Sequence, residues 1–147
     1  MIPVIAGNRP VVEVLIEIGG RLVAQGCRSM GGDTGCSYGN QGNHCAVGFL
    51  LDDEDSAVMG SGRVVDSLYD FYGEDLGINH EFIGANLAVL KEVQGIHDSP
   101  YKNERKATLT GVIGLLEDDK ETTDRLRAAF EPWVNLGKPK GYTGDLG

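Results

Sequence analysis

The segment that decides the fold runs from Cys27 to Asp55 and reads CRSMGGDTGCSYGNQGNHCAVGFLLDDED. It contains all three cysteines of the chain, two turns rich in glycine or asparagine, and an apolar run followed by four acidic residues. The short runs Cys36–Tyr38 and Cys45–Leu51 flank the second of these turns, so they predict a small β-hairpin. The second run also fits a buried helical turn that begins at Cys45, and over so few residues periodicity does not separate the two.

On either side of this segment, the sequence has the pattern of amphipathic helices. Apolar residues recur at helical spacing from Val11 to Leu22, with Pro10 in the first turn and Gly26 as the C-terminal cap. Further helices are predicted over about residues 64–72, 80–97, 109–116 and 122–131. Asn79 is expected to cap the second of these. Inside the first helix, Gly19-Gly20 lowers the helix propensity and allows a kink or a close neighbour.

The length of 147 residues predicts one domain with a single core. The predicted fold class is α+β, a single mainly helical domain over residues 1–136. It has four to five helices and the small β-hairpin of the Cys27–Asp55 segment. Residues 137–147 read GKPKGYTGDLG, and this glycine and proline content predicts a flexible C-terminal tail.

The charge of the chain restricts its partners. The formal net charge is −9, and the acidic residues concentrate between Asp52 and Asp98, where Arg63 and Lys91 are the only basic ones. Nucleic acid requires a basic face, so direct nucleic-acid binding is not predicted. No apolar run has the length of a membrane span, and three cysteines without a secretory leader favour the cytoplasm. An acidic surface suits a basic partner.

Cys45 and His97 form a candidate catalytic pair. A cysteine at a helix N-terminus has a stabilised thiolate, and a histidine can act as its base. Asp98 adds a carboxylate in a workable chain order, but as the direct neighbour of His97 it is not expected to orient the same ring. A small buried cysteine and a histidine near a helix end account for the same residues without any catalysis, and this interpretation is favoured.

Metal and cofactor motifs are incomplete. Zinc-type ligands occur at Cys27, Cys36, His44 and Cys45. Structural zinc pairs are usually separated by two to four residues, whereas successive cysteines here are nine positions apart and His44 adjoins Cys45. The glycine-rich stretch Gly31–Gly35 lacks the lysine of a phosphate-binding loop, and Asp52–Asp55 lacks the spaced ligands of a calcium loop. The sequence therefore predicts no metal and no cofactor.

Several of these features recur together in a recognisable order: Cys-x-Tyr, then Gly-x-x-Cys-Ala-x-Gly, an acidic pair, and an Ile-His-Asp helix end. They are carried here by Cys36, Tyr38, Cys45, Gly48, Glu54, His97 and Asp98. Over about residues 11–99 the pattern resembles a group of small, mostly uncharacterised proteins encoded by tailed phages and prophages. Gly39 and Asp52 depart from it, where arginine and proline are expected. The resemblance implies a phage or prophage origin, and it implies no catalytic residues.

These observations lead to a functional hypothesis, a phage-type accessory protein that binds a host or anti-phage-defence component without catalysis. The expected partner is a host or defence protein with a basic surface, and a homodimer is compatible with the size. The predicted contact residues are Asp52, Asp53, Glu54, Asp55, Tyr38 and His44. One alternative is a hydrolase or transferase centred on Cys45 and His97. Another is a module that sequesters a small ligand in a pocket beside the glycine-rich segment.

Overall fold

The computed structural model describes residues 3–26, 38–40, 43–52, 54–61, 63–116 and 119–136. Over these ranges the chain is mainly helical, with seven α-helices, two 3-10 helices and one pair of two-residue strands. The elements are α1 (Val11–Gln25), β1 (Gly39–Asn40), β2 (Asn43–His44), η1 (Val47–Leu50), α2 (Ser56–Met59), α3 (Val65–Tyr72), η2 (Gly73–Leu76), α4 (His80–Ala85), α5 (Leu87–Asp98), α6 (Lys102–Leu116) and α7 (Lys120–Val134).

The predicted α+β fold with a β-hairpin is wrong, because the part of the chain that the structure describes is mainly helical. A hairpin required residues 45–51 as its second strand, but the middle of this run forms the 3-10 helix η1. The pairing of β1 with β2 covers two residues on each side, which is too little to form a sheet layer. Every residue from Cys45 to Leu51 is buried. A run enclosed on all sides fits a tight helical turn in the interior better than a two-stranded ribbon with one face in water.

The C-terminal ends of the first helix and of α3 are confirmed, whereas Pro10, expected inside the first turn, is the N-cap residue before it. The α1 helix begins directly after Pro10 and stops at Gly26, which has φ 72° and donates its N–H to the Leu22 carbonyl. The α3 helix stops at Gly73, which has φ 51°. Glycine adopts a positive φ without the steric cost that other residues meet, so it marked both ends in the sequence.

The single helix predicted over residues 80–97 is wrong, because Asn86 divides it into α4 and α5. The side-chain amide of Asn86 donates to the Phe82 carbonyl at 2.8 Å, and its backbone leaves the helical region with φ −128° and ψ 29°. Asparagine competes for backbone hydrogen bonds in this way and interrupts helices. The apolar positions of residues 80–97 therefore belong to two helices, with Ile83 buried from α4 and Leu90 from α5.

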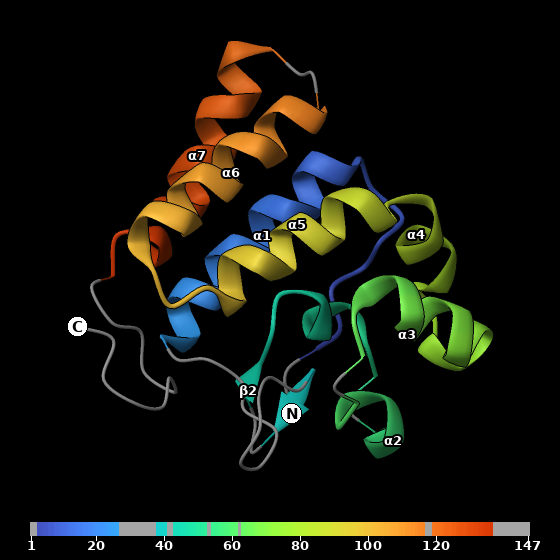
Figure 1. The fold of residues 1–147 in the computed structure, drawn as a ribbon. Coiled ribbons are helices and arrows are strands. Elements are labelled where there is room, and N and C mark those ends of the chain that lie inside the picture. Colours follow the sequence, from blue (N-terminus) through green and yellow to red (C-terminus); the bar gives the residue numbers. More distant parts are fainter. Residues whose placement is uncertain are drawn as a thin grey trace.

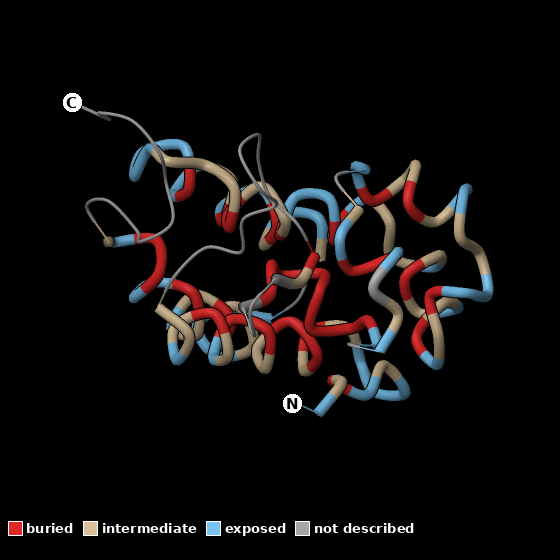
Figure 2. Tube along the Cα trace, turned by 90° about the horizontal axis from the view of Figure 1, so that it is seen from below, coloured by how far each residue is buried: buried red, intermediate tan, exposed pale blue. Residues whose placement is uncertain are grey.

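The helices pack in two groups. In the first, α7 packs on α1, α6 packs on α5, and α6 and α7 lie next to each other, as Figure 1 shows. In the second, α3 packs against α5, η2 and α4. Figure 1 shows this group at the opposite end of the molecule from the C-terminal end of α7. Buried positions follow the interior of the chain trace, and long exposed stretches lie at its outer edges (Figure 2).

The short helix η1 is tied to several other parts of the chain by backbone groups. The Val47 N–H donates to Gln94 Oε1 of α5 at 3.1 Å. The Phe49 carbonyl accepts the Ile5 N–H at 2.9 Å. The Leu50 carbonyl accepts the side-chain amide of Asn79 at 3.0 Å. The apolar run that follows Cys45 is therefore the centre on which the lead-in (residues 3–9), α4 and α5 converge.

The α7 helix extends further at its C-terminal end than predicted, because it continues through Pro132 to Val134. Trp133 is buried, and its indole Nε1 donates to the Ile96 carbonyl at 3.1 Å. The buried guanidinium of Arg105 donates to the Val134 carbonyl and, at 3.1 Å, to the Ser99 carbonyl. These bonds join the carboxyl ends of α5 and α7 to α6, and they satisfy carbonyls that the helix ends leave open.

The adjacent glycines of α1 provide a matched pair of stability variants. A Cβ at Gly19 would lie 3.0 Å from Phe130 Cδ2 and 3.1 Å from the Ala129 carbonyl oxygen, whereas a Cβ at Gly20 meets nothing within 4 Å. We expect Gly20→Ala to raise the free energy of unfolding by about 0.5–1 kcal/mol through helix propensity. We expect Gly19→Ala to lower it by about 1–2 kcal/mol, because α7 must move away. Urea denaturation followed through the single tryptophan, Trp133, measures both. Equal stability of the two variants would contradict the packing of α7 on Gly19.

Candidate functional site

Cys45 and His97 are both enclosed by protein. Cys45 is 1% exposed and His97 is 0% exposed. Cys45 stands near the start of the four-residue η1, where few peptide dipoles are aligned to stabilise a thiolate. Its backbone N–H donates to the Tyr38 carbonyl at 3.3 Å. A substrate has no access to either side chain in this arrangement, so the geometry favours a packing role for both.

The expectation that Asp98 does not orient the ring of His97 is wrong. Asp98 Oδ1 lies 2.7 Å from His97 Nδ1, and the same oxygen accepts the Gln94 Nε2 amide at 3.2 Å. On its other side, the His97 ring stacks on Trp133 with centroids 5.7 Å apart and planes at 8°. Because Gln94 also accepts the Val47 N–H, the network runs from η1 to the end of α5. It fixes the histidine between a carboxylate and an indole, inside the core.

The acidic residues after η1 organise their own turn. Asp52 Oδ1 accepts the Glu54 N–H at 2.9 Å, and Asp55 Oδ1 accepts the Val58 N–H at 3.1 Å in the first turn of α2. Asp52 and Glu54 are exposed, whereas Asp55 is half-buried. Asp53 lies outside the described residues. Two of the predicted contact carboxylates therefore also have a structural role, as turn and cap residues.

Tyr38 and His44, two of the predicted contact residues, are both buried in this structure. The Tyr38 hydroxyl donates to the Arg63 carbonyl at 2.5 Å. The His44 ring stacks on Phe49, with centroids 5.1 Å apart. Both side chains pack against the chain itself. Cys27 and Cys36, the other zinc-type residues of the sequence, lie outside the described residues. Within the described ranges, no group of three or more His, Cys, Asp or Glu side chains is arranged as metal ligands.

A different surface stands out, which we call the acidic lobe, residues 64–86. It comprises α3, η2 and α4, and its sequence contains no lysine or arginine. The exposed carboxylates of the lobe are Asp70, Glu74, Asp75 and Glu81. The nearest flanking cations are engaged by the lobe itself, since Lys91 Nζ lies 3.5 Å from Asp66 Oδ2 and the Arg63 guanidinium lies 3.9 Å above the Phe71 ring. The lobe therefore presents negative charge to solvent.

Large apolar side chains are exposed on the same lobe. Val64 is 60% exposed, Phe71 62% and Ile78 82%. Two further large apolar residues, Tyr101 and Leu115, are exposed on or beside α6. Exposed aromatic and aliphatic groups within a polar rim are the composition of a protein interface. The sequence pointed to the acidic region but selected the Asp52–Asp55 turn within it. The signal that marks the lobe is the stretch from residue 64 to 86 without any basic residue.

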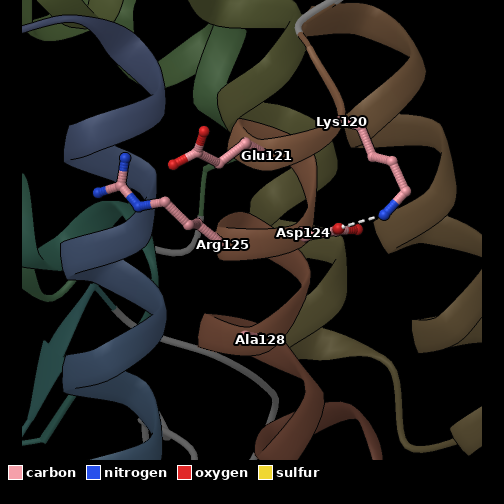
Figure 3. Close-up of a pocket in the computed structure, with 5 residues that line it drawn as sticks. All are labelled: Lys120, Glu121, Asp124, Arg125 and Ala128. Carbon is pink, nitrogen blue, oxygen red and sulfur yellow. Dashed lines mark hydrogen bonds and ion pairs between the residues drawn. The ribbon is translucent and has the colours of Figure 1, made fainter.

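The charged face of α7 differs from the acidic lobe, because its charges neutralise one another. Figure 3 shows the groove of about 600 Å³ on this face, where Lys120 Nζ binds Asp124 Oδ2 at 2.8 Å. Arg125 points towards α1 and binds both oxygens of Glu13, at 2.9 and 3.1 Å. The Arg125 hydrogen bond holds the pKa of Glu13 below its ordinary value. Such exposed pairs are ordinary surface contacts, so this face serves as a control surface for charge changes.

Comparison of the chain with known protein families, curated proteins and solved structures finds no match. Within the described ranges, no helix is both long enough and apolar enough to cross a membrane. The candidate site is therefore defined by its own residues, which are the exposed carboxylates and apolar side chains of the acidic lobe.

Proposed function

We propose that this protein acts by binding a partner protein through the acidic lobe. The observation that carries the proposal is the coincidence of two properties on residues 64–86. The lobe has exposed carboxylates with no lysine or arginine between them, and it exposes Phe71 and Ile78 among those carboxylates. Either property alone is common on protein surfaces. Together they resemble the core and the rim of a binding interface.

The two properties have separate physical roles in this proposal. The carboxylates attract a basic surface over several ångströms, so they raise the association rate and discriminate against acidic partners. The apolar side chains lose their contact with water in the complex and supply most of the affinity. Polyanions are repelled by the same charge, which disfavours nucleic acid as the partner. The expected partner is a protein with a basic surface that also presents apolar side chains.

The sequence resemblance to small proteins of tailed phages and prophages supports a narrower proposal for the partner. A phage-encoded protein works inside a host cell, so host components are among the targets available to it. We therefore propose a host protein, or a component of host defence against phage, as the partner. The protein would then act as an inhibitor or modulator that occupies a basic surface of its target.

Charge reversal on the acidic lobe tests this function. The protein is tagged and used to recover a stoichiometric partner from bacterial lysate, and the dissociation constant is then measured at two salt concentrations. We expect Glu74→Lys with Asp75→Lys to weaken binding about tenfold or more at low salt, and to reduce the salt dependence. The matched control, Glu121→Lys with Glu131→Lys on α7, changes the net charge equally and should alter affinity less than about twofold.

Two results would contradict the proposed function. One is the absence of any stoichiometric partner under conditions in which the tagged protein is folded. The other is an equal effect of the lobe variant and the α7 variant, which would assign the binding to net charge and not to the lobe. Circular dichroism of both variants establishes that each is folded before binding is measured.

A further inference from the structure

We propose that the groove between the lead-in and α4 is a docking site for a basic segment of the partner that inserts one large apolar side chain. The groove has a volume of about 450 Å³. Residues 6–8 of the lead-in line one side, and Ile78, Phe82 and Ala85 are among the residues that line the other. This inference rests on the proposed function. It specifies which part of the acidic lobe the partner contacts and which chemical groups of the partner make the contact.

The apolar wall of the groove is on the outward side of α4. The inward side is already occupied, because Ile83 is fully buried and Gly84 lies so close to α3 that a Cβ there would meet the Tyr69 ring at 2.6 Å. Phe82 and Ala85 are three residues apart on α4, and Ile78 lies in the turn that precedes this helix. Ile78 is 82% exposed. Ala85 is also exposed, whereas Phe82 is half-buried against the core. Exposed apolar groups beside a groove indicate a binding surface.

The two walls are held at a fixed separation. Asn79 Oδ1 accepts the Gly7 N–H at 2.8 Å, while its amide nitrogen donates to the Ile5 carbonyl at 2.6 Å. Gly7 has no space for a side chain, because a Cβ would lie 2.7 Å from Asn79 Oδ1 and 2.9 Å from Phe82 Cβ. A groove that exists before the partner arrives costs less conformational entropy on binding.

The charge around the groove selects its occupant. Glu81 lines the groove, and residues 64–86 carry no lysine or arginine. Arg9 lies near the lead-in wall, but its guanidinium is bound to the Ala6 carbonyl and to Glu17. A second copy of the chain, with a net charge of −9, would be repelled, as would an anionic membrane or nucleic acid. A segment with lysines or arginines around one leucine or phenylalanine matches both the charge and the apolar wall.

Two synthetic peptides test the groove: Lys-Arg-Ala-Phe-Arg-Lys and the same peptide with alanine in place of phenylalanine. Each is titrated into the isotopically labelled full chain, and amide shifts are followed by NMR. We expect the first peptide to bind about tenfold or more tightly than the second, with shifts concentrated at residues 6–8 and 78–86. Ile78→Ser should remove this preference. The control is Leu115→Ser, which replaces an exposed apolar side chain of similar size on α6, away from the groove, and should retain the preference.

Equal binding of the two peptides, no binding of either, or a preference that survives Ile78→Ser would overturn the groove as a docking site. So would self-association of the chain that Ile78→Ser abolishes, measured by sedimentation, because the occupant would then be a second copy. None of these results contradicts the existence of a partner from the lysate whose affinity is weakened by Glu74→Lys with Asp75→Lys. Failure of this inference is therefore distinguishable from failure of the proposed function.

Discussion

Gly48→Ala is expected to lower the free energy of unfolding by about 3 kcal/mol or more, at the upper end of the range for added volume in a packed core. A Cβ at Gly48 would lie 1.8 Å from the Tyr38 carbonyl oxygen and 2.8 Å from its carbonyl carbon. Both are backbone atoms, so no side-chain rotation relieves the clash. The Tyr38 segment is also held in place, since its hydroxyl bonds the Arg63 carbonyl and its own carbonyl accepts the Cys45 N–H.

Chemical denaturation followed by Trp133 fluorescence measures this effect. Gly114→Ala is the control, because a Cβ there meets nothing within 4 Å on the exposed side of α6. The control should be neutral or more stable by up to about 1 kcal/mol. A Gly48→Ala variant as stable as the control would show that the Tyr38 segment does not pack against η1. The expected loss also gives the glycine of the Gly-x-x-Cys-Ala-x-Gly pattern a physical reason, which is space for a crossing backbone.

Asn79→Ala should lower the free energy of unfolding by about 3–5 kcal/mol, because it leaves three interior backbone groups without partners. The Asn79 side chain is 3% exposed. It accepts the Gly7 N–H and donates to the Ile5 and Leu50 carbonyls. These bonds join the lead-in, η1 and the start of α4. Asn135→Ala, at an exposed asparagine after α7, is the control and should change stability by less than about 0.5 kcal/mol.

Asn79→Asp tests the two donor bonds of Asn79 separately, because it keeps the shape of the side chain and replaces the amide donor by a carboxyl group. The ionised form places negative charge against two carbonyl oxygens, so the folded-state pKa of this carboxyl should be raised above its unfolded value of about 3.9. The folded state then binds the proton more tightly. The variant should be most stable below about pH 4 and should lose stability as pH rises through the folded-state pKa. A variant whose stability relative to the native chain does not fall between about pH 4 and 7 would contradict the two donor bonds assigned to Asn79.

The sequence predicted the position of Asn79 at the start of a helix correctly, but the role predicted for its side chain was wrong. Asn79 precedes α4, as predicted for a cap, but its side chain makes no capping bond to that helix. Instead it binds residues 72 and 74 positions earlier in the chain, Gly7 and Ile5. Helix capping is a local preference that sequence can indicate. A bond across more than seventy residues depends on how the whole chain folds back, and no local pattern contains it.

The sequence of the Cys27–Asp55 segment likewise indicated where the core lies, but not which secondary structure forms there. Its apolar run identified the buried centre of the fold, because seven adjacent residues without charge are unfavourable in water. The choice between a strand and a helical turn was open, and the helical turn η1 depends on its enclosure by the lead-in, α4 and α5. The pairing of Asp98 with His97 was missed for a related reason. The side-chain orientation at the end of α5 is fixed by Gln94 and by the stacking of Trp133.

By itself the sequence determined the C-terminal ends of α1 and α3 at Gly26 and Gly73, and the acidic character of the region after Asp52. Each of these follows from the conformational limits of single residues or from the sum of their charges. Only the tertiary structure decided that Gly48 faces a backbone, that Asn79 joins three segments and that Ile78 is exposed. These properties depend on which distant groups fill the surrounding space, and long-range packing alone determines that.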